Sequence, residues 1–192
     1  MLTELSLPAL LEELAAPREV PGAGSALALA LSAAAAVVQM AARLSPESWP
    51  EAAGVAAQAE SIRERAATLI DDDAAAYEKA LETRAARDQE EKPERRDWAL
   101  GQVTAAAAEP PLAIARLATD LAELCAASGQ RVEPRVHADV AAAAALAAAV
   151  VRGACQLVVV NLTALPGDAR VDEAERLVAA ASEAAAVTAT GP

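Results

Sequence analysis

Apolar residues along this chain recur at the three-to-four-residue spacing of a helix, and almost nowhere do they alternate with polar residues as in a strand. In the first half of the chain this pattern predicts helices over residues 2–16, 25–44 and 51–87. The second of these is apolar nearly all round, which is typical of a helix at the centre of a bundle.

The second half of the chain predicts three more helices, over residues 94–128, 137–163 and 171–187. Pro110 and Pro111 predict a kink or a short break in the first of these, because proline lacks an amide donor and clashes with the preceding turn. Gly129 is the expected C-cap. No linker separates domains, so residues 1–192 are predicted to form one all-α domain of about six helices, two of them long.

Alanine determines how such a bundle is built. Hydrophobic residues make up 55% of the chain, yet phenylalanine is absent and there are only two tryptophans and one tyrosine. Alanine is the best helix former because it loses no side-chain entropy on ordering. We therefore expect closely packed, alanine-rich helices with leucine and valine filling the core.

The charge balance and the cysteines exclude several classes of protein. The formal net charge of −12 argues against binding to nucleic acids or anionic membranes, which attract basic surfaces. The longest apolar stretch, residues 26–42, is mostly alanine and predicts a buried helix rather than a membrane span. With no signal peptide recognisable, Cys125 and Cys155 are predicted to be small buried side chains of a cytoplasmic protein.

The first candidate for chemistry is the segment Pro21-Gly22-Ala23-Gly24-Ser25, which opens directly into an apolar helix. Glycines allow close backbone approach, and the free amides of a helix start suit an anionic group. The alternative is a tight turn with Ser25 as N-cap.

The second candidate is the run of three aspartates that ends at Asp73, with Tyr77 one turn later. Three consecutive residues of a helix point in three directions, so one or two of them at most can face the core. Either the run is a solvated acidic face, or Asp73 and Tyr77 line a polar pocket.

The third candidate is the pair His137 and Asp139 at the start of a helix. Histidine titrates near neutral pH, and an aspartate is stabilised at a helix N-terminus. The pair is either an electrostatic feature of the helix start or an acid/base group beside a ligand. No cluster of histidine, cysteine and carboxylate residues has the spacing of a metal site.

Taken in order, these segments resemble the cyclodeaminase/cyclohydrolase family, which includes the C-terminal domain of formiminotransferase-cyclodeaminase and stand-alone methenyltetrahydrofolate cyclohydrolases. The resemblance covers nearly the whole chain. The matching motifs are residues 21–25, Met40-Ala41-Ala42-Arg43-Leu44, Asp73-Ala74-Ala75-Ala76-Tyr77, Pro111-Leu112, Ala138-Asp139, Arg152-Gly153-Ala154 and Asn161-Leu162.

The resemblance implies an up-and-down helical bundle, a homodimer, and acid/base chemistry on a one-carbon unit of tetrahydrofolate. Tetrahydrofolate is the substrate, and no metal or further cofactor is implied. The catalytic residues would be Asp139, for charge stabilisation or as general base, and His137 as a proton shuttle. The substrate would bind at Gly22, Ala23, Gly24, Ser25, Asp73 and Tyr77.

Several positions depart from the family pattern. Ala23 replaces the middle glycine of the turn, Ala138 replaces a serine, and Gln130 replaces an asparagine. These losses of polar or flexible positions leave a second hypothesis open, in which the chain is a non-catalytic helical binding or scaffold protein that keeps the fold.

Overall fold

The computed structural model describes residues 1–45, 49–86 and 93–190, and in these residues it contains helices and no strand. The α-helices are α1 (Leu7–Ala15), α2 (Ala23–Leu44), α3 (Ala52–Ala86), α4 (Pro93–Ala107), α5 (Glu109–Ser128), α6 (His137–Asn161) and α7 (Ala169–Ala189). Short 3-10 helices, η1 (Leu2–Glu4) and η3 (Pro134–Val136), precede α1 and α6. The predicted all-α bundle is confirmed.

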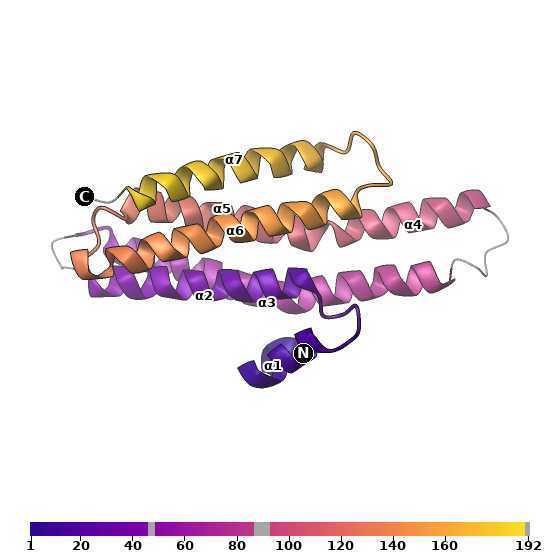
Figure 1. The fold of residues 1–192 in the computed structure, drawn as a ribbon, viewed down its shortest axis with the longest axis horizontal. Coiled ribbons are helices and arrows are strands. Elements are labelled where there is room, and N and C mark those ends of the chain that lie inside the picture. Colours follow the sequence, from indigo (N-terminus) through magenta and orange to yellow (C-terminus); the bar gives the residue numbers. More distant parts are fainter. Residues whose placement is uncertain (46–48, 87–92, 191–192) are drawn as a thin grey trace.

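The long helices run up and down along one common axis (Figure 1). Helices α2 and α6 lie side by side on the near side of this view, with α3 and α5 behind them and α7 on the outside of α5 and α6. The second half of α3 and the antiparallel α4 extend beyond the ends of α2 and α6, and α1 lies beside the bundle.

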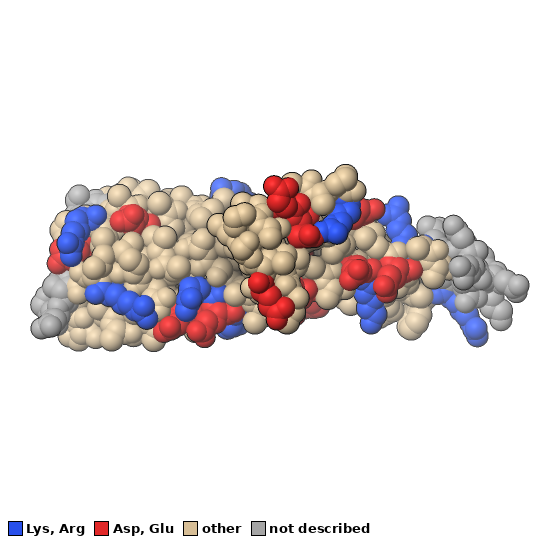
Figure 2. All heavy atoms as spheres, turned by 90° about the horizontal axis from the view of Figure 1, so that it is seen from below, with Lys and Arg blue, Asp and Glu red and all other residues tan. Residues whose placement is uncertain are grey.

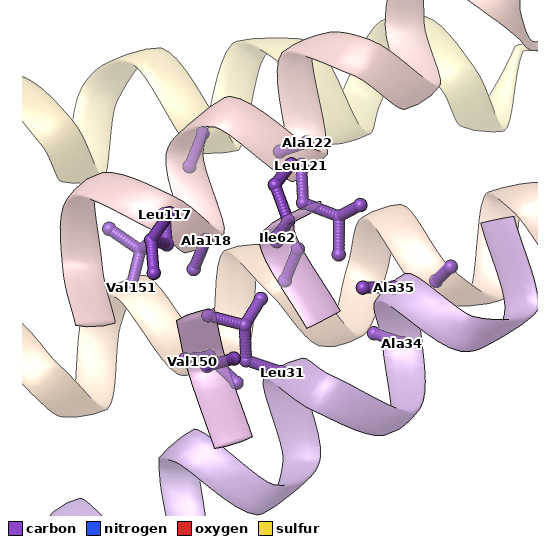
Figure 3. Close-up of a cluster of buried hydrophobic side chains, with 14 of the residues drawn as sticks. Leu31, Ala34, Ala35, Ile62, Leu117, Ala118, Leu121, Ala122, Val150 and Val151 are labelled. Atoms are coloured by element: carbon purple, nitrogen blue, oxygen red, sulfur yellow. The ribbon is translucent and has the colours of Figure 1, made fainter. Parts of the chain in front are cut away.

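The core is built from small side chains of four helices (Figure 3). Leu31, Ala34 and Ala35 of α2 meet Ile62 of α3. The cluster is completed by Leu117, Ala118, Leu121 and Ala122 of α5 and by Val150 and Val151 of α6. Many of the buried core residues are alanines, with leucine and valine filling the rest, as the composition predicted.

The helix boundaries differ from the predictions at three places. The first helix is interrupted at Leu5, and α1 starts anew with Ser6 as N-cap, whose side chain accepts a hydrogen bond from the Ala9 amide. The predicted break at the prolines occurs at Ala108, which separates α4 from α5. Helix α2 begins at Ala23 with Gly22 as N-cap, so the prediction of Ser25 as N-cap is wrong.

Two stretches, Ala23–Leu44 and Pro134–Asn161, are long and apolar enough to cross a membrane on length and composition alone. Half of each apolar window is buried inside the bundle, and the core helix of a soluble protein passes the same test. Seen from below, the surface carries acidic and basic side chains interspersed, with wide uncharged areas between them (Figure 2).

Candidate functional site

A cavity of about 220 Å³ lies where α2 begins, beside the middle of α3 and the C-terminal end of α6. The turn before α2 and its first residues contribute Gly22, Ala23 and Gly24, and α3 contributes Asp73 and Tyr77. Five of the six residues predicted to bind substrate therefore line one cavity. The α2–α3 packing brings them together from positions about fifty residues apart in the chain.

Asp73 is the buried acidic group of this cavity, with only 8% of its surface exposed. Its carboxylate lies directly against the backbone of Gly24, so closely that a Cβ atom on Gly24 would be 2.0 Å from Oδ1. No other residue type fits at position 24 without moving the carboxylate. Gly24 is thus required for close approach.

Burial raises the pKa of the Asp73 carboxyl above its ordinary value, because the charged form loses its hydration. Hydrogen bonds from the backbone and the hydroxyl of Ser25 oppose this shift without cancelling it. A carboxyl whose pKa is moved towards neutrality in a cavity is suited to accept and donate a proton during catalysis.

The contact between Asp73 and Gly24 changes the interpretation of the glycine turn, the segment Pro21–Ser25 before and at the start of α2. One of the two hypotheses drawn from the sequence was that the free amides at the start of this helix serve an anionic group of the ligand. In the structure the carboxylate of Asp73 already lies against this helix start, at Gly24 and Ser25. The anion at the N-terminus of α2 therefore comes from the chain itself.

Ser25 does not line the cavity, although it was predicted to bind substrate. It is buried behind Asp73, and its hydroxyl donates to the Ile70 carbonyl oxygen at 2.8 Å. The hydroxyl also lies 3.5 Å from Asp73 Oδ2. Ser25 therefore fixes the register of α2 against α3 and supports the carboxylate.

Tyr77 and Glu19 form the outer wall of the cavity. The Tyr77 hydroxyl donates to Glu19 Oε2 at 3.3 Å. Burial and the negative charge of Glu19 raise the pKa of Tyr77, and Arg84 acts in the opposite direction. The residues that line the cavity include two acids and no basic side chain, so the cavity favours a cationic or neutral group.

The other two aspartates of the run have different surroundings. Asp71 accepts hydrogen bonds from the backbone amides of Leu2 and Thr3 and from the Thr3 hydroxyl, which fastens η1 to α3. Asp72 is exposed. The run is therefore neither a uniform solvated face nor a single site, because each aspartate points in its own direction, as helix geometry requires.

His137 and Asp139 lie at the opposite end of α6 from the cavity. Twenty-two residues separate Asp139 from Asn161, which is about 33 Å along a helix axis. The resemblance assigns the segment Pro21–Ser25 and Asp139 to one site, but within a single chain the two lie far apart. The physical reason is that α6 runs antiparallel to α2, so its N-terminal end meets the end of α2 rather than its start.

At this far end Asp139 is exposed and makes no ion pair with another described residue, and His137 Nε2 is buried without a described hydrogen-bond partner. Both lie in the first turn of α6, where a negative charge is favoured by the helix dipole. A single chain does not bring these two residues to the cavity, so their catalytic roles stay a prediction.

Two polar lining residues, Glu19 and Asn161, were not assigned to the site from the sequence, although Asn161 belongs to one of the matching motifs. Asn161 Nδ2 donates to the Ala107 carbonyl oxygen at 2.9 Å and ties the end of α6 to the end of α4. An asparagine is unusual in so apolar a helix, and this was a signal by which Asn161 could have been assigned to the site. Glu19 lies in an irregular segment with no periodicity, so nothing in the pattern singled it out.

The described residues hold no group of three histidine, cysteine or acidic side chains able to bind a metal ion. Cys125 and Cys155 are buried and unpaired, and burial raises the pKa of their thiols to about 12 and about 11. Both cysteines are therefore structural, as predicted, and neither is a reactive thiolate.

Comparison with known proteins agrees with the fold. The family model described as formiminotransferase-cyclodeaminase matches residues 6–180. A crystal structure of formiminotetrahydrofolate cyclodeaminase from Thermotoga maritima matches with a TM-score of 0.84 and 19% identity, covering 98% of this chain and 96% of that one. A search of curated proteins gave no match. On the extent of the family match, this chain belongs to the formiminotransferase-cyclodeaminase family.

Proposed function

We propose that the cavity at the start of α2 binds the one-carbon end of a tetrahydrofolate derivative and catalyses acid/base chemistry there. The reaction is either cyclisation of 5-formiminotetrahydrofolate with loss of ammonia or hydration of 5,10-methenyltetrahydrofolate. The observation that carries this proposal is the buried carboxyl of Asp73 in an acidic cavity without basic lining residues.

Both substrates match that electrostatic character. The protonated formimino group and the methenyl bridge are cations whose charge is spread over a carbon between two nitrogens. An acidic cavity attracts such a group, and it stabilises the positive charge when water is excluded.

One carboxyl can serve either reaction. In cyclisation, N10 attacks the formimino carbon, Asp73 accepts the proton released from N10, and it returns that proton to the nitrogen that leaves as ammonia. In hydration, Asp73 accepts a proton from the water whose oxygen attacks the methenyl carbon, and it gives this proton to N5 as the bond between N5 and that carbon breaks. The remaining hydroxyl proton passes to solvent as the formyl carbonyl forms on N10. Both steps need a carboxyl able to hold a proton near neutral pH.

The test uses the full chain with both substrates. Formation of methenyltetrahydrofolate with release of ammonia reports cyclisation, and decay of methenyltetrahydrofolate absorbance reports hydration. We expect one of the two rates to exceed the buffer rate, and Asp73→Asn to lower it about 10²- to 10⁴-fold.

Asp72→Asn is the matched control, because it removes the same charge from the neighbouring exposed residue of α3. It is expected to leave the rate unchanged. If neither substrate is converted and no folate raises the melting temperature, the proposal is wrong and the non-catalytic hypothesis replaces it.

A further inference from the structure

The break between α4 and α5 leaves a buried backbone carbonyl without its helical partner. In a continuous helix, the amide four positions further along the chain donates to each carbonyl. For the Ala107 carbonyl this position is Pro111, and a proline has no amide hydrogen. Ala107 is buried, and an unpaired buried carbonyl costs free energy, so another group has to supply the donor.

Asn161 is the side chain that supplies this donor. Its Nδ2 donates to the Ala107 carbonyl oxygen at 2.9 Å. A carbonyl oxygen only accepts hydrogen bonds, so the orientation of the Asn161 amide is fixed, with Nδ2 on Ala107 and Oδ1 on the other side. Asn161 lines the cavity, and no described residue donates to Oδ1. Oδ1 is therefore an oriented acceptor that is left for a ligand.

A second side chain holds the same break from the start of α7. Arg170 Nη1 donates to the Ala105 carbonyl oxygen at 2.8 Å and to Glu109 Oε1 at 2.6 Å. Its Nε donates to Asp168 Oδ1 at 2.9 Å and its Nη2 to Asp168 Oδ2 at 2.7 Å, and these bonds lower the pKa of Asp168 to about 2. The guanidinium is thus held in one orientation, and it joins the last turn of α4 to the first residue of α5.

Both side chains act on one wall of the cavity. Ala107 and Pro111, on either side of the break, line the cavity. The two residues that Arg170 contacts lie two positions before and two positions after Ala107. A shift of the break would move the Ala107 carbonyl, and with it the amide of Asn161 that is bonded to this carbonyl.

The other polar side chains of the cavity are acceptors as well. Asp73 and Glu19 are carboxyl groups, and the Tyr77 hydroxyl gives its hydrogen to Glu19 and keeps its own oxygen as an acceptor. Such a cavity selects a ligand that brings N–H donors. Tetrahydrofolate carries them at N5 and N10, whereas in 5,10-methenyltetrahydrofolate both nitrogens are fully substituted and carry no hydrogen.

We infer that Asn161 is a specificity-determining residue whose Oδ1 accepts a hydrogen bond from an N–H group at the one-carbon end of the ligand, and that Arg170 is a positioning residue that acts through the Ala107 carbonyl. The inference rests on the proposed function, because it takes the ligand to be a tetrahydrofolate derivative. Asn161 touches the ligand, whereas Arg170 does not line the cavity and only determines where the Asn161 amide lies.

Isothermal titration calorimetry of tetrahydrofolate into the full chain tests the role of Asn161. Asn161→Leu keeps a similar volume and has no acceptor. We expect it to raise the Kd of tetrahydrofolate about tenfold, the loss of one hydrogen bond, and to change the affinity for 5,10-methenyltetrahydrofolate by less than about twofold. The second affinity is measured by competition, or as KM if this folate is converted.

Gln156→Leu is the matched control, because it removes the same amide from an exposed position of α6 that does not line the cavity. It is expected to leave both affinities unchanged. An equal loss of affinity for the two folates after Asn161→Leu would assign Asn161 to structure alone, since a displaced cavity wall affects every ligand.

Arg170→Met tests the positioning role, with Arg176→Met at an exposed position of α7 as control. We expect Arg170→Met to raise the Kd of tetrahydrofolate about threefold at unchanged binding stoichiometry. A role in stability alone would lower the melting temperature and the number of binding sites and leave the Kd unchanged. In the Asn161→Leu background Arg170→Met should have no further effect on the Kd, and additive effects would overturn the positioning role.

Failure of the proposed function gives a different result. A wild-type chain that binds tetrahydrofolate and converts neither substrate removes the catalytic part of the proposed function, and the binding tests of Asn161 and Arg170 still decide the inference. A wild-type chain that binds no folate overturns both. Wild-type binding that Asn161→Leu leaves unchanged overturns the inference alone.

Discussion

Similar chemical groups lie near the two ends of α6, in opposite surroundings. Near the C-terminal end, Asp73 of α3 is buried in a cavity beside Tyr77 and Asn161. At the N-terminal end, Asp139 is exposed near His137, and it does not line the cavity. One end has an enclosed acid without a cation, and the other has an exposed aspartate without an enclosure.

The difference shows that packing, and not residue type, decides which carboxylate is poised for chemistry. Both aspartates were singled out by sequence, Asp139 as a catalytic residue and Asp73 as a substrate-binding one. Burial of Asp73 against Gly24 raises the pKa of its carboxyl. Asp139, by contrast, is exposed to water. A protein that used both ends in one reaction would have to bring two chains together.

The largest combined effect on stability and turnover is expected for Gly24→Ala, which disturbs the buried Asp73 carboxyl. The added Cβ overlaps the Asp73 carboxylate, and overpacking of this kind costs about 1–3 kcal/mol of unfolding free energy. Folate turnover should be lost with it. Urea unfolding and the folate assays measure the two effects.

Gly54→Ala is the matched control, because nothing lies within 4 Å of a Cβ atom at this position in α3. It is expected to stabilise the protein by about 0.5–1 kcal/mol, since alanine is the better helix former. If Gly24→Ala leaves both stability and turnover unchanged, the contact between Gly24 and the Asp73 carboxylate contributes to neither.

Asp139→Asn sharpens the comparison at the exposed end. The substitution should change the unfolding free energy by no more than about 0.5 kcal/mol, because the side chain is exposed. Turnover should nevertheless fall about tenfold or more if this residue serves the cavity of a second copy. Turnover equal to that of the wild type would assign Asp139 to helix-start electrostatics alone.

The pH dependence of stability separates the two aspartates in another way. Because burial raises the Asp73 pKa above 3.8, the folded state keeps this proton to higher pH than the unfolded chain does. The Asp73 contribution to the unfolding free energy therefore falls as pH rises from about 3.8 and levels off above the folded-state pKa. The unfolding free energy of the wild type minus that of Asp73→Asn, measured by urea unfolding from pH 4 to 8, should decrease as the pH rises. A difference that rises with pH would contradict the burial argument.

The smallest effect is expected for Tyr77→Phe. It removes one hydrogen bond to Glu19 in a partly exposed position, which is worth about 1 kcal/mol or less. Thermal unfolding should show a small loss of stability, and turnover should fall by a few-fold at most. A loss as large as that of Asp73→Asn would make Tyr77 the principal acid/base group instead.

Much of the fold could be predicted because local signals and tertiary packing agree. Apolar periodicity placed the long helices, Pro110 and Pro111 marked the break at Ala108, and Gly129 caps α5 as expected. The first helix was misjudged, because Ser6 and Pro8 form a start signal inside an apparently continuous pattern.

The candidate site could be predicted only in part. The glycine turn, Asp73 and Tyr77 were found because each is unusual within its helix. The contact of Asp73 with the start of α2 depends on how α2 and α3 align, which no local pattern encodes. The separation of Asp139 from the cavity likewise follows from the antiparallel course of α6, a property of topology.

Mixing two impaired variants tests most directly whether the two ends of α6 act together across a pair of chains. Asp73→Asn and Asp139→Asn are each purified, mixed under conditions that let subunits exchange, and assayed for folate turnover. If the site is shared, half of the dimers are mixed and each has one intact site, so about a quarter of wild-type activity returns. If exchange is verified and activity stays at the level of the separate variants, the two ends of α6 do not form one site.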